Sequence, residues 1–315
     1  MKMVNKLVVV FFVIVLALAQ YGAASALNYL STHDDTNLWL KEGSANAPWD
    51  VLLDNVSISQ AQISGNRTGF LDASGRVWVK DGSKTAPWIL LADNVYEFKM
   101  LSDQIYIIDS SFQLRMKAGD IKSGWILLKT NTYQVEVSSN RILATTNYDG
   151  YQTELVVKEG SIYSPWVTLA YPVSYYDGSA SLPMMAVSDK RIAYFEGDYD
   201  NFQYKEGSIY SPWWTWIYGG SGFGVKLTND RMCINTVEDP YVRVYCRDGL
   251  IYQGTSWVMV HGNALLTDIS ENTIAIHSLG GDGYPIDSLE VLSGSLAQNT
   301  GWKNIDVGQW LDLSK

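Results

Sequence analysis

A basic residue followed by an acidic residue recurs along this chain, each time a few positions before a tryptophan. An ammonium group beside a carboxylate can hydrogen-bond to sugar hydroxyls while a nearby indole stacks on the sugar face. The alternative is an exposed ion pair at a strand end, worth about 0–1 kcal/mol, which is the commoner case and the one that we favour. The pairs are Lys41–Glu42, Lys80–Asp81, Lys158–Glu159, Lys205–Glu206 and Arg247–Asp248.

Aromatic residues are concentrated around the second copy of the nine-residue phrase "KEGSIYSPW". The longest connection between predicted strands, "AYPVSYYDGSASLP", precedes that copy, and "WWTWIYGGSGFG" overlaps its end. A tyrosine-rich loop beside a tryptophan-rich strand predicts a ligand platform, although a thicker core between repeats would give the same pattern. The predicted saccharide site comprises Tyr175, Tyr176, Lys205, Glu206, Trp214, Trp216 and Tyr218.

Sequence motifs for catalysis are absent. The three histidines, His33, His261 and His277, are far apart, and there is no G-x-S-x-G, HExxH or glycine-rich phosphate loop. We therefore expect no enzyme activity and no cofactor. Two carboxylates from distant repeats could still meet at a central channel, so a glycosidase remains a less favoured alternative.

Each predicted repeat carries an acidic residue in the loop between its second and third strands, as in "DASG" and "DSSF". Such loops could bind calcium or a cationic ligand, but none has EF-hand spacing. Aspartate also favours turns because its side chain accepts backbone hydrogen bonds. We prefer this backbone explanation and predict no metal site.

The phrase itself belongs to a repeat. Identical copies occupy residues 158–166 and 205–213, and looser copies bring the total to seven. The tryptophans that end the copies are separated by 39, 37, 41, 47, 44 and 45 residues. A period near 40 residues indicates a solenoid, a propeller or an array. These tryptophans are Trp49, Trp88, Trp125, Trp166, Trp213, Trp257 and Trp302.

Each repeat has the pattern of four short β-strands. In the second repeat these are "VSISQAQIS", "RTGFLDA", "RVWVKDG" and "PWILLADN", separated by turn residues. Four strands at this period predict an all-β, seven-bladed β-propeller. The first repeat lacks an innermost strand, and the C-terminal segment "GQWLDLSK" has the pattern of one. We expect this segment to complete the N-terminal blade and close the ring.

The recurring residues of the phrase have structural explanations. The glycine after the acidic residue suits a turn with positive φ. The tryptophan is large enough to pack between adjacent blades, and we favour this role over ligand contact.

The stretches "WLKEGSANAPWDVLLDNV" and "VWVKDGSKTAPWILLADNV" resemble the repeats of tectonin-like and tachylectin-like β-propellers, which are secreted or surface carbohydrate-binding proteins. The resemblance implies a lectin with repeated sites between or on the blades, and glycans or glycoconjugates as partners. Leu292 and Ser293 replace the basic and acidic residues of the last copy, which places binding there in doubt. The alternative is an extracellular propeller that binds a protein, for example at a cell surface, and has no sugar affinity.

The N-terminal residues have the pattern of a signal peptide. Lys2 and Lys6 precede the apolar run Leu7–Ala19, and small residues favour cleavage after Ala26. An uncleaved anchor is the less favoured alternative. A secreted propeller domain would then occupy residues 27–315, and loss of two lysines would take its net charge from −10 to −12. Such an acidic chain is poorly suited to nucleic acid, and no later run is long and apolar enough for stable membrane insertion.

Two cysteines, Cys233 and Cys246, lie in one predicted hairpin. If its turn centres on Asp239–Pro240, the cysteines face each other and form a disulfide, which would contribute about 3 kcal/mol or less. Two buried thiols are the alternative. The sequons at Asn55 and Asn66 predict glycosylation if the chain passes through a eukaryotic secretory pathway.

Overall fold

The computed structural model describes residues 13–17, 29–33, 37–42, 50–147, 152–174, 184–196, 201–217, 221–238, 241–249, 256–270, 273–281, 284–293, 296 and 302–304. Within these ranges the regular structure is entirely β-strand. No helix there is both long enough and apolar enough to cross a membrane. The prediction of an all-β fold is therefore confirmed.

The strands form four-stranded antiparallel sheets, named here sheets 1 to 7 in chain order. Sheet 1 contains β1 (Val13–Ala17), β2 (Tyr29–His33), β3 (Leu38–Glu42) and β4 (Asp50–Leu53). Sheet 2 contains β5 (Ile58–Ser64), β6 (Arg67–Asp72), β7 (Val77–Asp81) and β8 (Ile89–Ala92). Sheet 3 contains β9 (Val95–Met100), β10 (Gln104–Asp109), β11 (Leu114–Ala118) and β12 (Ile126–Lys129). Sheet 4 contains β13 (Thr132–Val137), β14 (Arg141–Thr146), β15 (Gln152–Glu159) and β16 (Val167–Ser174). Sheet 5 contains β17 (Met185–Val187), β18 (Arg191–Glu196), β19 (Asn201–Glu206) and β20 (Trp214–Ile217). Sheet 6 contains β21 (Ser221–Leu227), β22 (Arg231–Glu238), β23 (Tyr241–Asp248) and β24 (Val258–His261). Sheet 7 contains β25 (Ala264–Ser270), β26 (Thr273–Gly281), β27 (Tyr284–Ser293) and β28 (Trp302–Asn304).

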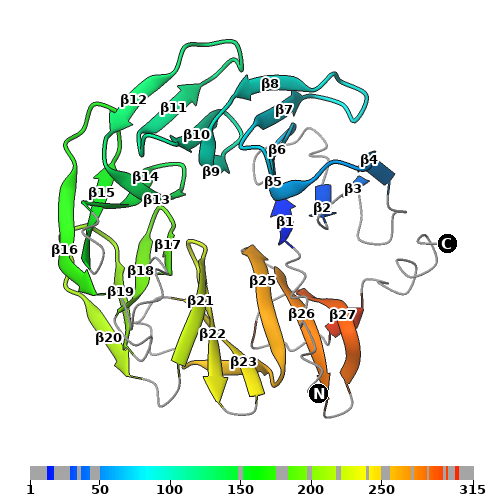
Figure 1. The fold of residues 1–315 in the computed structure, drawn as a ribbon. Helices are drawn as coiled ribbons and strands as arrows, with labels where there is room; N and C mark the ends of the chain where they lie inside the picture. Colours follow the sequence, from blue (N-terminus) through cyan, green and yellow to red (C-terminus); the bar gives the residue numbers. More distant parts are fainter. Residues whose placement is uncertain are drawn as a thin grey trace, which may run out of the picture.

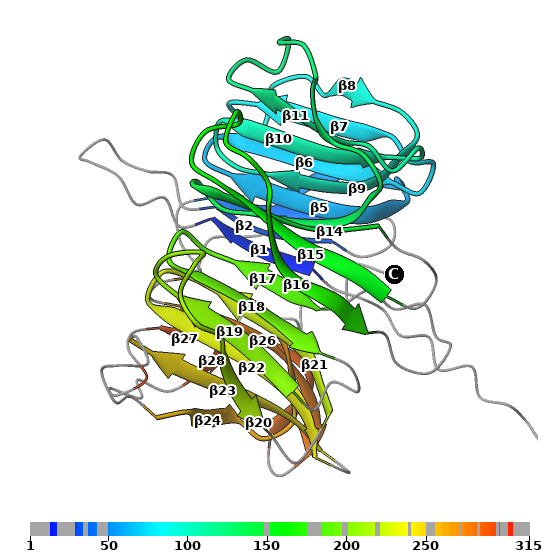
Figure 2. The same cartoon turned by 90° about the vertical axis from the view of Figure 1, so that its left-hand side faces the viewer.

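The sheets are arranged around a common centre, as the blades of a propeller (Figure 1). Consecutive strands pair within each sheet, and its first strand lies nearest the centre while the fourth lies at the perimeter. Seen from the side, the strands run across the thickness of the ring (Figure 2), so the connecting loops collect at its two faces. The four strands predicted for the second repeat correspond to β5, β6, β7 and β8.

The innermost strand of sheet 1 differs from the one predicted. β1, which belongs to the apolar run of the predicted signal peptide, pairs with β2 from Val13↔His33 to Ala17↔Tyr29. β1 also contacts β5 of the next sheet and β25 of sheet 7. The C-terminal segment 308–315, which was expected at this position, lies outside the described residues.

The hydrophobic core lies between neighbouring sheets. One cluster combines Val77 and Val79 of sheet 2 with Val95 and Phe98 of sheet 3, all of them buried. Equivalent clusters join sheets 3 and 4, sheets 4 and 5, and sheets 5 and 6. Sheets 3, 4 and 5 are thus apolar on both faces, as expected for sheets that stack against a neighbour on either side.

The predicted disulfide is confirmed. Cys233 in β22 and Cys246 in β23 lie opposite each other in the antiparallel register, with 4.1 Å between their Cα atoms, and their sulfurs are bonded. Both are fully buried. The predicted turn at Asp239–Pro240 lies outside the described residues, although the strands that flank it pair.

Candidate functional site

The tryptophan of the phrase packs between adjacent sheets, as predicted. Trp166 of sheet 4 packs against the cluster that includes Tyr106 of sheet 3, and its Nε1 donates to the Leu128 carbonyl at 3.1 Å. Trp213 of sheet 5 packs in the same way against sheet 4, with Nε1 3.4 Å from the Leu169 carbonyl. At these two junctions the indole is therefore held partly buried between the sheets by packing and by its own hydrogen bond.

The lysine of the phrase is buried and is not part of an exposed ion pair, so that interpretation is wrong. Lys205 is 5% exposed, and its Nζ donates to the Ile209 carbonyl at 2.7 Å and lies 4.5 Å from the Trp213 ring centre. Lys158 likewise binds the Ile162 carbonyl at 2.9 Å and lies over Trp166. Burial lowers the pKa of Lys205, because the apolar surroundings disfavour the charged form.

The acidic residue of the phrase pairs instead with an arginine that opens the second strand of the same sheet. Arg141 Nε lies 2.7 Å from Glu159 Oε1, and Arg191 Nε lies 3.2 Å from Glu206 Oε1. Within each sheet the two members are opposite each other in the strand register. The same pairing joins Arg67 with Asp81 and Arg231 with Asp248.

The arginine also reaches the next sheet. Nη2 of Arg141 donates to the carbonyl of Gly207, the phrase glycine of sheet 5, and Nη2 of Arg191 donates to Gly249 of sheet 6. Arg67 makes the same bond to Gly119 of sheet 3. We call this unit the arginine clamp: an arginine, its acidic partner and the glycine carbonyl of the following sheet. The glycines have φ between 68° and 79° at these three positions, which confirms the predicted positive φ.

Sheet 3 lacks the clamp. Gln104 takes the arginine position and Ala118 the acidic position, and these two residues are opposite each other in the register. The junction between sheets 3 and 4 is joined nearer the ring centre: Lys99 Nζ of β9 lies 2.6 Å from Glu136 Oε1 of β13. Glu97 Oε2 also accepts the Val135 backbone N–H at 3.0 Å.

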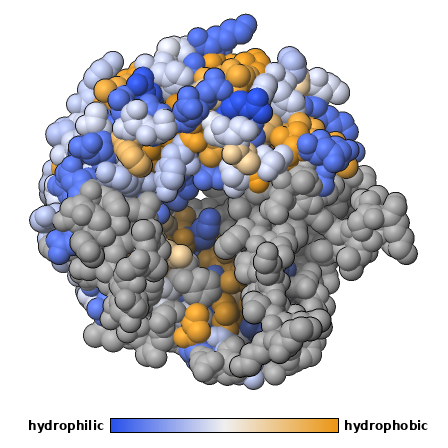
Figure 3. Space-filling view, viewed as in Figure 1, coloured by the Kyte–Doolittle hydropathy of each residue, from blue (hydrophilic) through white to orange (hydrophobic). Residues whose placement is uncertain are grey.

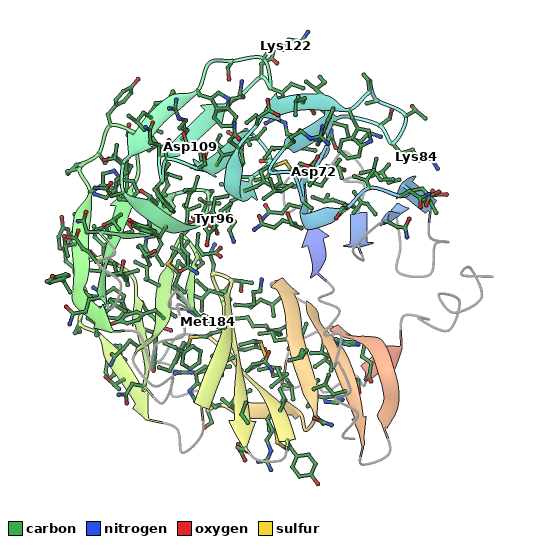
Figure 4. The ribbon with its side chains drawn as sticks, viewed as in Figure 1. Asp72, Lys84, Tyr96, Asp109, Lys122 and Met184 are labelled. Atoms are coloured by element: carbon green, nitrogen blue, oxygen red, sulfur yellow. A yellow bond between two sulfur atoms is a disulfide. The ribbon has the colours of Figure 1, made fainter. Side chains whose placement is uncertain are left out.

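The tyrosine of the phrase projects into solvent. Tyr163 is 88% exposed and Tyr210 is 78% exposed, at equivalent positions of sheets 4 and 5. Both lie in loops fixed from beneath by the buried lysine and by a turn hydrogen bond, Ser164 N to Ser161 O and Ser211 N to Ser208 O, each 2.9 Å. Lys122 occupies the equivalent position of sheet 3 and lies at the perimeter of the ring (Figure 4). The two tyrosines are thus rigidly held, exposed aromatic groups at the outer edge.

The predicted aromatic platform is described only in part. Trp214 and Trp216 are two residues apart in β20 and share one face of it. Trp214 is 47% exposed, and it is the one exposed tryptophan among those whose side chains are described. Tyr175, Tyr176 and Tyr218 and the side chain of Trp216 lie outside the described residues. Lys205 and Glu206 are buried and bonded within the fold, Lys205 to the Ile209 carbonyl and Glu206 to Arg191.

The acidic loops between second and third strands follow the backbone explanation. Asp72 Oδ1 accepts the N–H groups of Ser74 and Arg76 at 2.9 and 3.0 Å, and Asp109 Oδ1 accepts those of Ser111 and Gln113 at 2.9 and 3.1 Å. The carboxylates therefore fold their own turns. No group of three or more potential metal ligands was found among the described residues.

Both predicted glycosylation asparagines, Asn55 and Asn66, are exposed and lie beside strand ends. Asn55 has a φ of 57°. Their side chains are therefore accessible to a modifying enzyme, and glycosylation stays a prediction.

A cavity of about 240 Å³ lies among the first strands of sheets 3 to 7. Its wall includes the charged residues Glu97, Glu136 and Lys226 and the apolar residues Met184 and Leu266. Figure 3 shows the hollow at the middle of the ring with hydrophilic and hydrophobic residues together, and Met184 points toward this region in Figure 4. The cavity mixes both charges, so it does not favour an ion of one sign.

Sequence reasoning missed the arginine clamp and the roles of Glu97 and Lys99 at the cavity wall. A signal for the clamp was present, since Arg67, Arg141, Arg191 and Arg231 each open the second strand of a repeat directly after a polar turn. Glu97 and Lys99 at the cavity wall gave no such signal, because their partners lie about 38 positions away in the sequence, on a strand of the next sheet.

Comparison with known proteins supports the fold alone. No protein-family model matches the chain, and no curated protein matches it. Among solved structures, the chain is similar to the β-propeller domain of the trilobed protease from Pyrococcus furiosus, with a TM-score of 0.64 and 10% identity over 94% of this chain and 98% of that one. That domain is described as having an open velcro topology.

Two further similarities are to the tricorn protease, with a TM-score of 0.61 and 8% identity, and to an acylaminoacyl peptidase from Pyrococcus horikoshii, with 0.61 and 10%. They cover 94% and 96% of this chain but only 35% and 54% of those proteins. The shared part is the propeller, so the chain has a β-propeller fold, and identities this low carry no information about activity.

Proposed function

We propose that this protein is a secreted carbohydrate-binding propeller whose ligands contact exposed aromatic side chains on sheets 4 and 5. The observation that carries the proposal is the exposure of Trp214. Large apolar side chains are normally buried, and every other described tryptophan side chain is at least partly packed into a sheet junction. An indole at the surface with one free face is suited to stack on a sugar ring.

Two features of the same region support repeated, weak sites. Tyr163 and Tyr210 present phenol rings on identical braced loops, and Tyr171 on β16 is also exposed. Rigid aromatic groups lose little conformational entropy on binding, which favours shallow sites of this kind. Several such sites on one ring would gain affinity through multivalency. Kinship with tectonin-like or tachylectin-like lectins remains part of the proposal.

The proposal includes a seven-bladed ring that closes after removal of the signal peptide. Cleavage after Ala26 removes β1 and leaves β2 with an unpaired edge facing β5 and β25. We infer that the segment 308–315 then pairs with β2, because an exposed inner edge would otherwise remain open. The open velcro topology of the trilobed protease domain is the alternative.

Closure is tested on the chain that begins at Leu27. Deletion of residues 308–315 from that chain should lower the melting temperature of the whole domain, since the first sheet would keep only three strands. An unchanged melting temperature would show that the ring does not close in this way.

The binding proposal is tested on a glycan array and by titration with the sugars that the array identifies. Trp214→Ala should weaken binding about tenfold, corresponding to about 1–2 kcal/mol for one stacked aromatic, while the fold survives. Trp166→Ala is the matched structural control and should cost about 3–5 kcal/mol of stability. If Trp214→Ala destabilises the protein as much as Trp166→Ala does, Trp214 is a core residue. If no glycan binds the folded wild type, the protein-binding alternative takes the place of this proposal.

A further inference from the structure

We propose that Glu97 is a proton-operated latch that fastens the junction between sheets 3 and 4 at the wall of the central cavity. It lies at the one junction among sheets 2 to 6 where Gln104 and Ala118 leave no arginine clamp to form. Its two sides are β9, which carries Glu97, and β13, whose Val135 N–H donates to the Glu97 carboxyl group.

The contact across the junction belongs to a series. In sheet 2, Gln60 Oε1 accepts the Phe98 N–H of sheet 3 at 3.1 Å. One sheet further, Glu97 Oε2 accepts the Val135 N–H of sheet 4 at 3.0 Å. The side chain of each inner strand thus binds the free backbone edge of the next inner strand. A neutral amide performs this task at one junction and an ionisable carboxyl group at the next.

The charged groups around Glu97 are few and come from both strands. Lys99 of β9 lies between two carboxylates, with Nζ 2.6 Å from Glu136 Oε1 of β13 and 3.5 Å from Glu97 Oε1. On the other side, β5 presents the uncharged residues Gln60 and Gln62. Lys226 of β21 lies on the wall of the same cavity. One lysine therefore serves two carboxylates, and Glu136 is the nearer partner.

This arrangement favours the neutral form of Glu97. Desolvation by burial, with a further contribution from the charge of Glu136, raises its pKa to about 7 against the attraction of Lys99. Glu97 therefore changes its protonation state near neutral pH, whereas an ordinary glutamate is already ionised.

An acceptor for the added proton lines the same cavity. Gln134 precedes Val135 in β13 and lies on the same cavity wall as Glu97. Its Oε1 atom is buried and has no hydrogen-bond partner among the described residues. We infer that protonated Glu97 donates to Gln134 Oε1 while its other oxygen keeps the Val135 N–H, so that the two strands are joined by two hydrogen bonds in place of one.

The direction of the pH effect follows from the raised pKa. The folded state binds the proton more tightly than the unfolded chain, whose glutamate has its ordinary pKa near 4.5. The stabilising contribution is therefore complete below about pH 4.5 and is lost as the pH rises through about 7. The junction is expected to be tightest in acid and to loosen toward neutral and alkaline pH.

The test compares the melting temperature of wild type and Glu97→Gln at intervals from pH 4.5 to pH 8.5. Glutamine reproduces the neutral latch permanently, as Gln60 does in sheet 2, so the two proteins should melt alike in acid. Above pH 7 the variant should melt higher, by about 2–4 °C for each kcal/mol lost by the wild type. Asp103→Asn, an equal change of charge on an exposed residue of the same sheet, is the control and should follow the wild-type profile.

A second measurement reports on the junction itself. Hydrogen exchange of the Val135 amide should slow on acidification, beyond the intrinsic pH effect, in wild type but not in Glu97→Gln. Parallel melting profiles for wild type and Glu97→Gln, or a Val135 amide whose corrected protection ignores pH in the wild type, would overturn the proposal.

Discussion

The junctions on either side of sheet 4 are joined in different ways. Between sheets 4 and 5, Arg141 binds Glu159 in its own sheet and the Gly207 carbonyl of the next. Between sheets 3 and 4 the corresponding positions hold Gln104 and Ala118, and the bonds across the junction are those of Lys99 and Glu97 at the cavity wall. The junction between sheets 2 and 3 has both kinds of bond, from Arg67 and from Gln60, so the inner bonds accompany the clamp at one junction and occur without it at the next.

The difference shows that the acidic residue of the phrase and the arginine work as one unit. Where the acidic residue is Ala118, the arginine is also missing, and the lysine of the phrase remains: Lys117 still binds the Ser123 carbonyl and lies 5.0 Å from the Trp125 ring centre. The lysine and tryptophan thus form one device within a sheet, and the arginine, carboxylate and glycine form another between sheets. Only the second device distinguishes the two junctions.

The largest expected effect is the loss of a clamp. Arg191 is 1% exposed, and its partner Glu206 is also buried. Arg191→Ala would leave the Glu206 carboxylate and the Gly249 carbonyl without this partner in a buried place, at a cost of about 3–5 kcal/mol measured by urea unfolding. Gln104→Ala, at the same position of the unclamped sheet, removes one neutral hydrogen bond, from the Tyr106 hydroxyl, and should cost only about 1 kcal/mol. Equal losses in the two variants would mean that the clamp adds nothing to the junction.

The next effect concerns the device that both junctions share. Lys205→Met removes the donor to the Ile209 carbonyl and the cation above Trp213. Because the carbonyl would be left without this donor near a buried side chain, we expect a loss of about 1–3 kcal/mol in the free energy of unfolding. Lys122→Met, on an exposed loop residue, is the control and should change it by less than about 0.5 kcal/mol. A Lys205→Met protein as stable as wild type would contradict the role assigned to the buried lysine.

A smaller gain is expected if a clamp is transferred to sheet 3. Gln104→Arg with Ala118→Glu places an arginine opposite a carboxylate, within reach of the phrase glycine of sheet 4, Gly160. Buried ion pairs often gain little over the residues they replace, so the expected stabilisation is only about 1 kcal/mol. A double-mutant cycle measures it, because each single change should destabilise the protein. Additive single effects would show that position alone does not create the clamp.

The sequence predicted the parts of this structure that depend on local pattern. Four strands per repeat, positive φ at the phrase glycines, tryptophans packed between sheets and the Cys233–Cys246 bond all follow from spacing and residue type. The environment of Lys205 was not predictable in this way. The Lys205 ammonium group could point to solvent or bind a carbonyl of the loop that follows it. Which of the two occurs depends on how tightly that loop folds over the side chain, and a pair of adjacent charges in the sequence does not reveal this.

The candidate site was harder to predict because a ligand can contact its aromatic side chains only where they are exposed to solvent. Trp213 and Trp214 are neighbours in the sequence, yet Trp213 lies in a junction and Trp214 at the surface, since successive side chains of a strand face opposite ways. Strand alternation separates the two faces but does not say which one is covered. That depends on sheets brought together from distant parts of the chain.

The smallest effect on stability is expected at the tips of the phrase loops, and it separates binding from folding most clearly. Tyr163 and Tyr210 contact little of the fold, since the lysine and the turn hydrogen bonds beneath hold the loop. Tyr163→Ala and Tyr210→Ala should therefore each change the free energy of unfolding by less than about 0.5 kcal/mol. If both rings contact a multivalent glycan, each single change should weaken its binding severalfold. The fold-loss of affinity in the double variant should exceed the product of the two single fold-losses, because a second contact on the same glycan benefits from effective concentration. A monovalent form of the same glycan should lose only the contribution of one ring. Unchanged binding to both forms in the double variant would confine the ligand to the face that carries Trp214, and the two exposed tyrosines would then be surface residues without a part in recognition.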